Sequence, residues 1–369
     1  MVHTDGILAG VTGLTLKHVL MFIVGGTLIW LAIAKDYEPS LLLPIGFGAI
    51  LANIPFSAAV APGGFLELLN RVGILTELFP ILIFIAIGAM CDFAPLLQNP
   101  SLMLFGAAAQ FGVFFTLVVA TLAGFPLKEA AAIGIIGAAD GPTSIYVATR
   151  FAPRLLAPIT VAAYSYMSLV PIIQPLIIRR LTTPKERRIR MSLGREGVSR
   201  TTLILFPIGV TLLAGLVAPI SVPLIGSLMF GNLLRESRAV PALSQAAQKE
   251  LANLVTLLLG ITIGSTMQAE TFLTPTTLLI MGMGLVAFAA DTAGGVLFGK
   301  FLNLFLRRKI NPMIGAAGIS AFPMSARVIA RMATKEDPQN YLLMHAVGAN
   351  VAGQIASIMA GGLILALVR

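Results

Sequence analysis

Two stretches decide the fold of this chain: GIIGAADGPTS at residues 134–144 and NPMIGAAGISAFPMS at residues 311–325. Each contains Ile-Gly-Ala-Ala, then a polar residue and a proline, and each lies inside a long apolar segment. Paired apolar segments interrupted by glycine and proline are typical of the ion or substrate sites of membrane carriers. Their broken helices are tolerated in lipid where the freed backbone groups line a polar cavity. We call 134–144 the first interrupted segment and 311–325 the second, and we expect both to face one site.

The composition of the chain is that of a membrane protein. Hydrophobic residues make up 57% of the sequence, charged residues only 11%, and the mean hydropathy is +0.92. A soluble domain has about 25% charged residues. We predict an all-α polytopic, multi-pass protein of the cell inner (plasma) membrane, with about 11 transmembrane helices, some of them broken. The single cysteine, Cys91, excludes an intramolecular disulfide and a multi-cysteine metal site.

The main hydrophilic segment is strongly basic and divides the chain. We expect a first membrane half at 1–178, a basic cytoplasmic loop at 179–201 and a second membrane half at 202–369. The basic residues of the loop are Arg179, Arg180, Lys185, Arg187, Arg188, Arg190, Arg195 and Arg200. Arginine and lysine accumulate in cytoplasmic loops, so the net charge of +9 is explained by topology, without a nucleic-acid partner. A docking surface for a soluble partner is the alternative interpretation of the loop.

The two halves also resemble each other outside the interrupted segments. Ile85-Ala86-Ile87-Gly88 is similar to Ile261-Thr262-Ile263-Gly264, and both precede the Ile-Gly-Ala-Ala of their own half. We therefore expect internal repeats. Whether they are parallel or inverted depends on the number of spans in each half, which the sequence leaves open.

Asp140 is the strongest candidate for a functional residue. A carboxylate near the middle of a bilayer costs at least ~2.5–3.5 kcal/mol, so its presence there indicates a function. Pro142 cannot donate to the helical ladder and frees a carbonyl one turn earlier. An anionic oxygen beside free carbonyls suits Na⁺ or H⁺. The alternative is a structural aspartate that hydroxyls or backbone amides bind.

Neutral oxygens accompany Asp140 elsewhere in the sequence. Asn311, Ser320 and Ser325 lie in the second interrupted segment, and Asn350 lies in Gly-Ala-Asn-Val-Ala-Gly-Gln at 348–354. Each alone is typical of helix packing. If they face Asp140 together, they form an oxygen cage with one fixed charge, in which ligand number and cavity size select Na⁺.

Two tyrosines and two arginines complete the set of candidates. Tyr164 and Tyr166 lie beside serines in an apolar span, where a phenol relays a proton or holds a cation ligand in place, although an interfacial belt is the usual role. Arg327 and Arg331 follow the second interrupted segment. Arginine binds carboxylates through two parallel hydrogen bonds, so one of them could hold an anionic group at the cytoplasmic mouth; snorkelling to the interface is the alternative. Asp291 is a further buried polar anchor.

Motifs for the hydrolysis of ATP and for common covalent catalysis are absent from the sequence. There is no Gly-x4-Gly-Lys-Ser/Thr loop, no His-Glu-x-x-His, no Gly-x-Ser-x-Gly and no Cys-x-x-Cys. The energy for transport must therefore come from an ion gradient or from a chemical group that a partner delivers.

Three segments point to a known family. Residues 136–143, 164–175 and 311–327 resemble the β subunit of the sodium-pumping biotin-dependent decarboxylases, which act on oxaloacetate, methylmalonyl-CoA or glutaconyl-CoA. The resemblance extends over nearly the whole chain. It implies an enzyme subunit that decarboxylates carboxybiotin, consumes a proton and couples this reaction to Na⁺ export. No biotin-accepting Met-Lys-Met is present, so the biotin would be carried by a partner.

The resemblance also implies roles for partners and residues. A carboxyltransferase α subunit, a biotin carrier protein and a small single-span γ-type subunit would accompany a homotrimer of this chain in the lipid membrane. By position, Asp140, Asn311 and Asn350 would be Na⁺ ligands. Tyr166 and Ser320 would belong to the Na⁺ and proton pathway, and Arg327 would meet carboxybiotin.

Two other classes of protein fit parts of this pattern. A stand-alone Na⁺-coupled secondary transporter or Na⁺/H⁺ antiporter would use the same broken helices. Such a carrier would work alone in liposomes, whereas a β subunit would copurify with its partners. A structural membrane anchor would gain nothing from the buried polar residues. The acyl substrate stays open, because the α subunit selects it.

Overall fold

A computed structural model describes residues 8–36, 38–192 and 197–368 of the chain. Within these residues the protein is helical and has no β-strand, which confirms the predicted all-α class. Arg195, a member of the predicted basic loop, lies outside the described residues.

Five described helices are long and apolar enough to cross a membrane. They are α2 (Leu16–Lys35), the continuous run Pro100–Leu122 that contains α7 (Met103–Ala108) and α8 (Phe111–Leu122), α13 (Arg200–Val217), α18 (Pro275–Phe305) and α21 (Leu343–Leu367). Two bent pairs raise the number to seven: Phe65–Ile74 with α5 (Leu78–Met90), and the two parts of α11 (Leu156–Leu181). The protein is therefore a multi-pass membrane protein.

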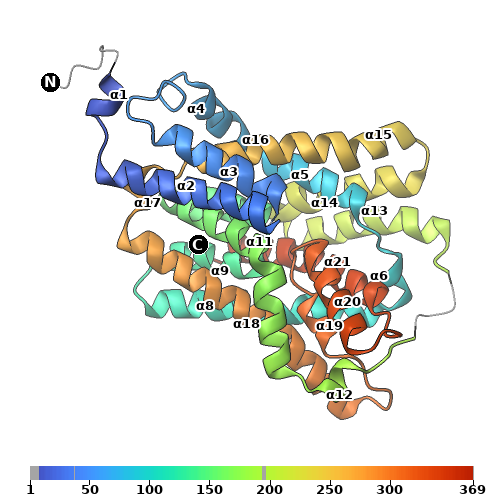
Figure 1. Ribbon diagram of the computed structural model, residues 1–369. Helices are drawn as coiled ribbons and strands as arrows, with labels where there is room; N and C mark the ends of the chain where they lie inside the picture. Colours follow the sequence, from blue (N-terminus) through green and yellow to red (C-terminus); the bar gives the residue numbers. More distant parts are fainter. Residues whose placement is uncertain (1–7, 37, 193–196, 369) are drawn as a thin grey trace.

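Shorter helices complete two bundles. The first bundle adds α3 (Pro39–Ala52), α14 (Val222–Ser237) and α16 (Ala252–Ser265) to α2, α5 and α13. The second bundle combines α8, α11, α18 and α21. Figure 1 shows α2, α3 and gold α16 together above orange α18 and teal α8 and α9. The remaining short helices are α1 (Ala9–Thr12), α4 (Phe65–Leu69), α6 (Ala94–Gln98), α12 (Pro184–Arg187), α15 (Pro241–Ala246) and α17 (Ala269–Phe272).

Glycines set two corresponding helix crossings in the first bundle. A Cβ atom on Gly264 of α16 would lie 2.0 Å from the Ile45 carbonyl oxygen of α3. A Cβ atom on Gly88 of α5 would lie 1.8 Å from the Leu228 carbonyl oxygen of α14. Only glycine permits backbones to approach this closely. Gly88 and Gly264 end the two similar Ile-x-Ile-Gly sequences, so these sequences play the same packing role.

The first interrupted segment forms a helical hairpin. It consists of α9 (Leu127–Gly134), a 3₁₀ turn at Ile135–Ala138 and α10 (Gly141–Phe151). Arg154, just after α10, donates from Nε to Oε1 of Glu129 at the start of α9, over 2.6 Å. The two ends of the hairpin therefore lie at the same face, and its tip is at residues 138–141.

The second interrupted segment forms a hairpin from the other face. Its arms are α19 (Met313–Ala316) and α20 (Met324–Glu336). Asn311 before α19 and Glu336 at the end of α20 both bind Arg187. Arg187 follows the end of α11, whose start lies near Arg154. The hairpins thus enter from opposite ends of α11. We call the Arg187 end the basic face.

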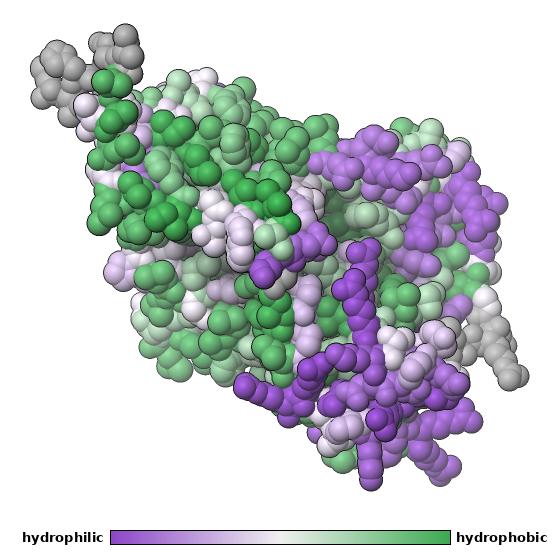
Figure 2. Space-filling model, in the orientation of Figure 1, coloured by the Kyte–Doolittle hydropathy of each residue, from purple (hydrophilic) through white to green (hydrophobic). Residues whose placement is uncertain are grey.

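Surface hydropathy agrees with a membrane location. Figure 2 shows hydrophobic side chains over α2 and α3, and hydrophilic side chains gathered over α12 and beside α15. Between the two hydrophilic regions the surface is hollowed. Only 11% of the residues in the apolar stretch of α13 are buried inside the protein, and only 17% of those in α2. Such apolar surfaces are stable when lipid or another subunit covers them.

Candidate functional site

The tips of the two hairpins meet inside the second bundle. The Ser320 backbone N–H donates to the Ala138 carbonyl over 3.0 Å. Ala139 has a φ of 52°, which ends the 3₁₀ turn and directs the chain into α10. Pro142 lies in the first turn of α10, where its missing N–H costs no helical hydrogen bond. The sequence thus produces a sharp turn with Asp140 at its end.

Asp140 is the N-cap of α10 and is buried. Its Oδ1 accepts from the Thr143 N–H (3.2 Å) and its Oδ2 from the Thr143 hydroxyl (2.7 Å). The Ser357 hydroxyl of α21 also donates to Oδ2, over 2.6 Å. A helix N-terminus stabilises a negative charge. A purely structural aspartate would make the same contacts, so the space beside Asp140 decides between the two interpretations.

A cavity of about 230 Å³ adjoins Asp140. Asp140, Tyr164, Ser320 and Gln354 line it, as does Arg327. Residues near the basic-face ends of α3, α5 and α16 also line it, namely Glu38, Ser40, Met90 and Ala252. The cavity therefore connects the buried carboxylate with the basic face. Its volume admits several water molecules or a hydrated cation.

One side of α21 holds the tip of the second hairpin. Asn350 donates from Nδ2 to the Ile319 carbonyl over 2.6 Å, and Gln354 donates to the Ser320 carbonyl. The Ser320 hydroxyl donates to the Gly353 carbonyl over 2.9 Å. Among the described residues, Asn350 Oδ1 is buried without a hydrogen-bond partner. Asn350 thus lies beside the tip, and its carboxamide oxygen accepts no hydrogen bond from the described residues.

Sequence reasoning missed three residues of this site. Thr143 and Ser357 bind the Asp140 carboxylate, and Gln354 lines the cavity. A signal for two of them was present: residues 350, 354 and 357 are spaced four and three apart, which places them on one helix face. Thr143 occupies the N3 position of α10, where an N-cap aspartate finds its donor.

The two tyrosines point in different directions. The Tyr166 hydroxyl donates to the Met281 carbonyl of α18, and Tyr166 does not line the cavity. Tyr164 lines the cavity, and a Cβ atom on Gly141 would lie 2.2 Å from its Cζ atom. The structure therefore brings Tyr164, rather than the predicted Tyr166, to Asp140.

Asn311 does not join Asp140. Its Nδ2 donates to the carbonyls of Arg187 (2.8 Å) and Ile189 (3.0 Å), and its Oδ1 accepts from the Met313 N–H (3.1 Å). Asn311 stands at the base of the second hairpin, whereas Ser320 stands at the tip. Asn311 therefore does not take its expected place in one cage with Asp140, because its amide group binds the carbonyls at the end of α12 and just after it.

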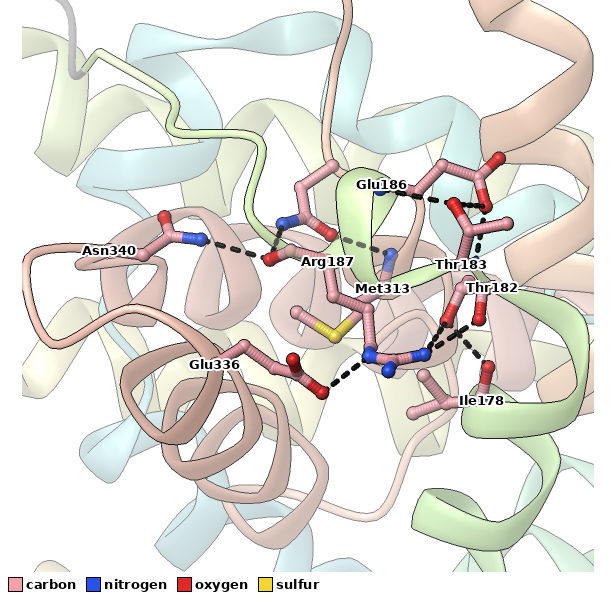
Figure 3. Close-up of polar contacts among 9 residues, drawn as sticks. Ile178, Thr182, Thr183, Glu186, Arg187, Met313, Glu336 and Asn340 are labelled. Carbon is pink, nitrogen blue, oxygen red and sulfur yellow. Dashed lines mark hydrogen bonds and ion pairs between the residues drawn. The ribbon is translucent and has the colours of Figure 1, made fainter.

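Asn340 makes the same pair of hydrogen bonds from the other side. Its Nδ2 donates to the carbonyls of Arg187 (3.1 Å) and Ile189 (3.3 Å). The Arg187 guanidinium binds Glu336 (2.7 Å) and the Thr182 carbonyl (2.6 Å), as Figure 3 shows. We call Arg187, Asn311, Glu336 and Asn340 the clasp. It ties residues 182–189 to both ends of the second hairpin.

Arg327 is exposed and lines the cavity from α20. Among the described residues it has no acidic group within ion-pair distance. Glu38 lines the same cavity. Burial raises the pKa of Glu38 above its usual value, although the charge of Arg327 opposes this shift. Arg331 is also exposed but does not line the cavity.

Comparisons with known proteins identify the family of the chain. The family model described as "Na+-transporting oxaloacetate decarboxylase beta subunit" matches residues 17–368. The chain belongs to this family. It is 51% identical to the glutaconyl-CoA decarboxylase subunit beta of Acidaminococcus fermentans, over 98% of this chain and 96% of that protein. It is 47% identical to the methylmalonyl-CoA decarboxylase subunit beta of Propionigenium modestum, over 97% and 96%. It is 44% identical to the oxaloacetate decarboxylase beta chain of Klebsiella pneumoniae, over 96% and 97%.

Other buried polar groups of this β-subunit chain have packing roles. Gln174 of α11 donates to the Ala316 carbonyl (2.8 Å), and Ser325 exchanges hydrogen bonds with Gln174. Asp291 of α18 accepts from the N–H groups of Gly112 and Val113 at the start of α8. Ser325 therefore supports the second hairpin from below its tip, and Asp291 caps a neighbouring helix.

Several ion pairs lie at the basic face of the β-subunit chain. Burial alone would raise the pKa of Glu186. Hydrogen bonds from Thr183 and from Lys300 outweigh this effect and hold the pKa below its usual value. The hydrogen bonds between Arg190 and Asp337 lower the pKa of Asp337. These pairs attach the segment after α11 to α18 and to the loop after α20. The cavity beside Asp140 opens at this face.

Proposed function

We propose that this β subunit decarboxylates carboxybiotin, consumes a proton and couples the reaction to the export of Na⁺. One observation carries the proposal: a buried carboxylate, Asp140, faces a cavity that opens at the basic face beside Arg327, an arginine with no ion-pair partner among the described residues. A cation site and an anion site share one cavity. A stand-alone carrier would need only the first of them.

The sodium site is proposed at the meeting point of the two hairpins. Asp140 supplies the charge, and Ser320 and Asn350 supply neutral oxygens. The free Oδ1 of Asn350 supports its role, because buried polar atoms seldom lack a partner and Na⁺ prefers oxygen ligands. Asn311 is assigned to the clasp. The Tyr166 hydroxyl donates to the Met281 carbonyl of α18, so Tyr166 lies outside the proposed sodium site.

The carboxybiotin site is proposed at Arg327. A guanidinium binds a carboxylate through two charge-assisted hydrogen bonds. In the reaction the N–C bond of carboxybiotin breaks, CO₂ leaves, and the ring nitrogen takes a proton. Na⁺ and H⁺ compete for the Asp140 carboxylate, since a nearby cation favours its ionised form. This competition couples the arrival of Na⁺ with the delivery of the proton.

The proposed topology has two inverted repeats and about 11 membrane-crossing or broken helices. The opposed hairpins and the corresponding crossings at Gly88 and Gly264 support it. The basic face is proposed to be cytoplasmic in the inner membrane, as the accumulation of arginine there suggests. Residues 179–201 then form the loop between the halves 1–178 and 202–369.

The proposed partners deliver the carboxyl group and cover apolar surface. A carboxyltransferase α subunit would load the biotin, a biotin carrier protein would bring it to Arg327, and a small single-span γ-type subunit would join them in the membrane. A homotrimer of this chain is the proposed assembly. The largely exposed α2 and α13 are the surfaces that lipid, copies of this chain or a single span would cover.

The function is tested with purified protein in liposomes. Free carboxybiotin is added outside, and CO₂ release and ²²Na⁺ uptake into the vesicles are measured together. We expect decarboxylation that needs Na⁺, with Na⁺ uptake in proportion, and loss of both in Asp140→Asn. Gradient-driven Na⁺ flux without carboxybiotin, equal to the flux with it, would favour the stand-alone carrier and overturn the proposal.

A further inference from the structure

Tyr164 is a buried group beside Asp140 that the proposed sodium site does not include. Its side chain is 2% exposed, and its hydroxyl has no hydrogen-bond partner among the described residues. A buried hydroxyl without a partner is rare, because burial removes its bonds to water and gains none in return. Tyr164 also lines the cavity that Asp140 lines, so its hydroxyl is placed to coordinate a cation bound there.

The position of the phenol is fixed by its surroundings. Tyr164 and Asp140 line the same cavity. A Cβ atom on Gly141 would lie 2.2 Å from Cζ of Tyr164, the ring carbon that carries the hydroxyl. The oxygen end of the ring therefore lies against the residue that follows Asp140. Any side chain at position 141 would displace the ring, so glycine there is required by this contact.

Tyr166 provides an internal comparison. It is on the same helix, two residues later, and its hydroxyl is occupied by the Met281 carbonyl. Its ring also packs near Gly284 of α18. Residues two apart on a helix face different directions. Of these two tyrosines of α11, Tyr166 bonds to α18 through its hydroxyl, whereas the Tyr164 hydroxyl has no hydrogen-bond partner among the described residues.

We propose that the Tyr164 hydroxyl oxygen is a direct ligand of the cation bound at Asp140. This inference rests on the proposed function and names an additional ligand for its site. A phenol oxygen is a neutral, hard donor of the kind that Na⁺ accepts. Within the described part of the chain, Oδ1 of Asn350 is likewise buried without a hydrogen-bond partner, and it lies beside the same tip. Together they give the carboxylate two neutral companions from different helices.

The test compares Tyr164→Phe with Tyr166→Phe in purified protein. Thermal stability is followed as Na⁺ is added at constant ionic strength, with K⁺ as the balancing salt. Tyr164→Phe should raise the Na⁺ concentration for half-maximal stabilisation about tenfold and leave stability in K⁺ unchanged or higher. Tyr166→Phe should lower stability in K⁺ and leave the Na⁺ response as in the wild type.

Asp140→Asn separates failure of this inference from failure of the function. If wild type lacks a Na⁺-specific response, the proposed site itself is wrong. If Asp140→Asn loses the response and Tyr164→Phe keeps the wild-type affinity, only the role of Tyr164 is overturned.

A second measurement covers the case in which Tyr164→Phe does not fold. Infrared difference spectra of protein with ring-labelled tyrosine are recorded with Na⁺ against K⁺. A phenol C–O band that shifts with Na⁺ and persists in Tyr166→Phe is expected. Absence of that band in the wild type, or its loss in Tyr166→Phe, would contradict the proposal.

Discussion

The backbone amide of Ser320 donates to the carbonyl of Ala138, which joins the tips of two hairpins that enter from opposite faces. Each tip is followed by its own polar side chains, and α21 contributes Ser357 and Asn350 beside them. A broken helix in a membrane needs partners for its free backbone groups. Here one backbone hydrogen bond joins the two broken helices, side chains of α21 bind the carbonyls of Ile319 and Ser320, and the carboxylate of Asp140 lies at the junction.

The clasp gives the first prediction. Asn311→Ala and Asn340→Ala should each lower the free energy of unfolding by ~1–3 kcal/mol, because each removes the donors to the Arg187 and Ile189 carbonyls. Chemical denaturation in detergent measures this loss. The Na⁺ concentration for half-maximal stabilisation should not change in either variant.

Because Asn311 and Asn340 make matching hydrogen bonds, each variant is the control for the other. A clasp predicts matching phenotypes, and a double variant more destabilised than the sum of the singles, because only the double variant removes both donors to the Arg187 and Ile189 carbonyls. If Asn311→Ala alone weakened Na⁺ binding, and Asn340→Ala did not, Asn311 would be a ligand in some other state of the protein.

Glu38 should weaken the binding of an anion at Arg327. Both line the cavity, so Glu38→Gln removes a negative charge that repels the carboxylate of carboxybiotin. At pH 8, KM for free carboxybiotin should fall about two- to fivefold, with little change in kcat. Glu67→Gln, on α4 and outside this cavity, is the matched control. An unchanged KM in Glu38→Gln would place the anion site elsewhere.

Backbone contact at the glycine crossings predicts a stability pattern. Gly88→Ala and Gly264→Ala should each cost ~1–3 kcal/mol, since a methyl group would overlap a carbonyl of the facing helix. Gly209→Ala in α13 meets nothing within 4 Å and should be neutral or stabilising. Thermal unfolding in detergent ranks the three. Equal costs at all three positions would argue against the close crossings.

The pair Arg190–Asp337 predicts a dependence on pH. Arg190 holds the pKa of Asp337 below its usual value of about 3.9, so the pair stabilises the folded protein fully above that pH. The contribution is lost as the pH falls through the lowered pKa. The difference in Tm between wild type and Asp337→Asn should be present at pH 6 and shrink below about pH 4. A difference that grows with acid would have the wrong sign.

The sequence was sufficient for the fold class and for the tip residues. Asp140 and Ser320 stand out because lipid penalises polar groups, and glycine and proline mark the breaks. Asn311 was misplaced because a hairpin separates residues that lie close in sequence: it stands at the base, and Ser320 at the tip. Sequence adjacency does not distinguish these two ends.

The two tyrosines of α11 illustrate a second limit on what the sequence can predict. Residues two apart on a helix point to different sides, so at most one of Tyr164 and Tyr166 faces Asp140. Which one it is depends on the rotation of α11, and packing against α10 and α18 sets that rotation. Thr143, Gln354 and Ser357 were missed for a related reason. Their side chains are ordinary in a helix, and only the crossing of α10, α20 and α21 brings them together.

The central claim is that Asp140 binds Na⁺ at the junction of the two hairpins, and thermal stabilisation tests it most directly. Purified wild type and Asp140→Asn are titrated with NaCl at constant ionic strength, with KCl as the balancing salt. Binding to the folded state raises Tm by mass action. We predict a saturable rise with Na⁺ in the wild type and no rise in Asp140→Asn. An equal, saturable rise in both proteins would contradict the account.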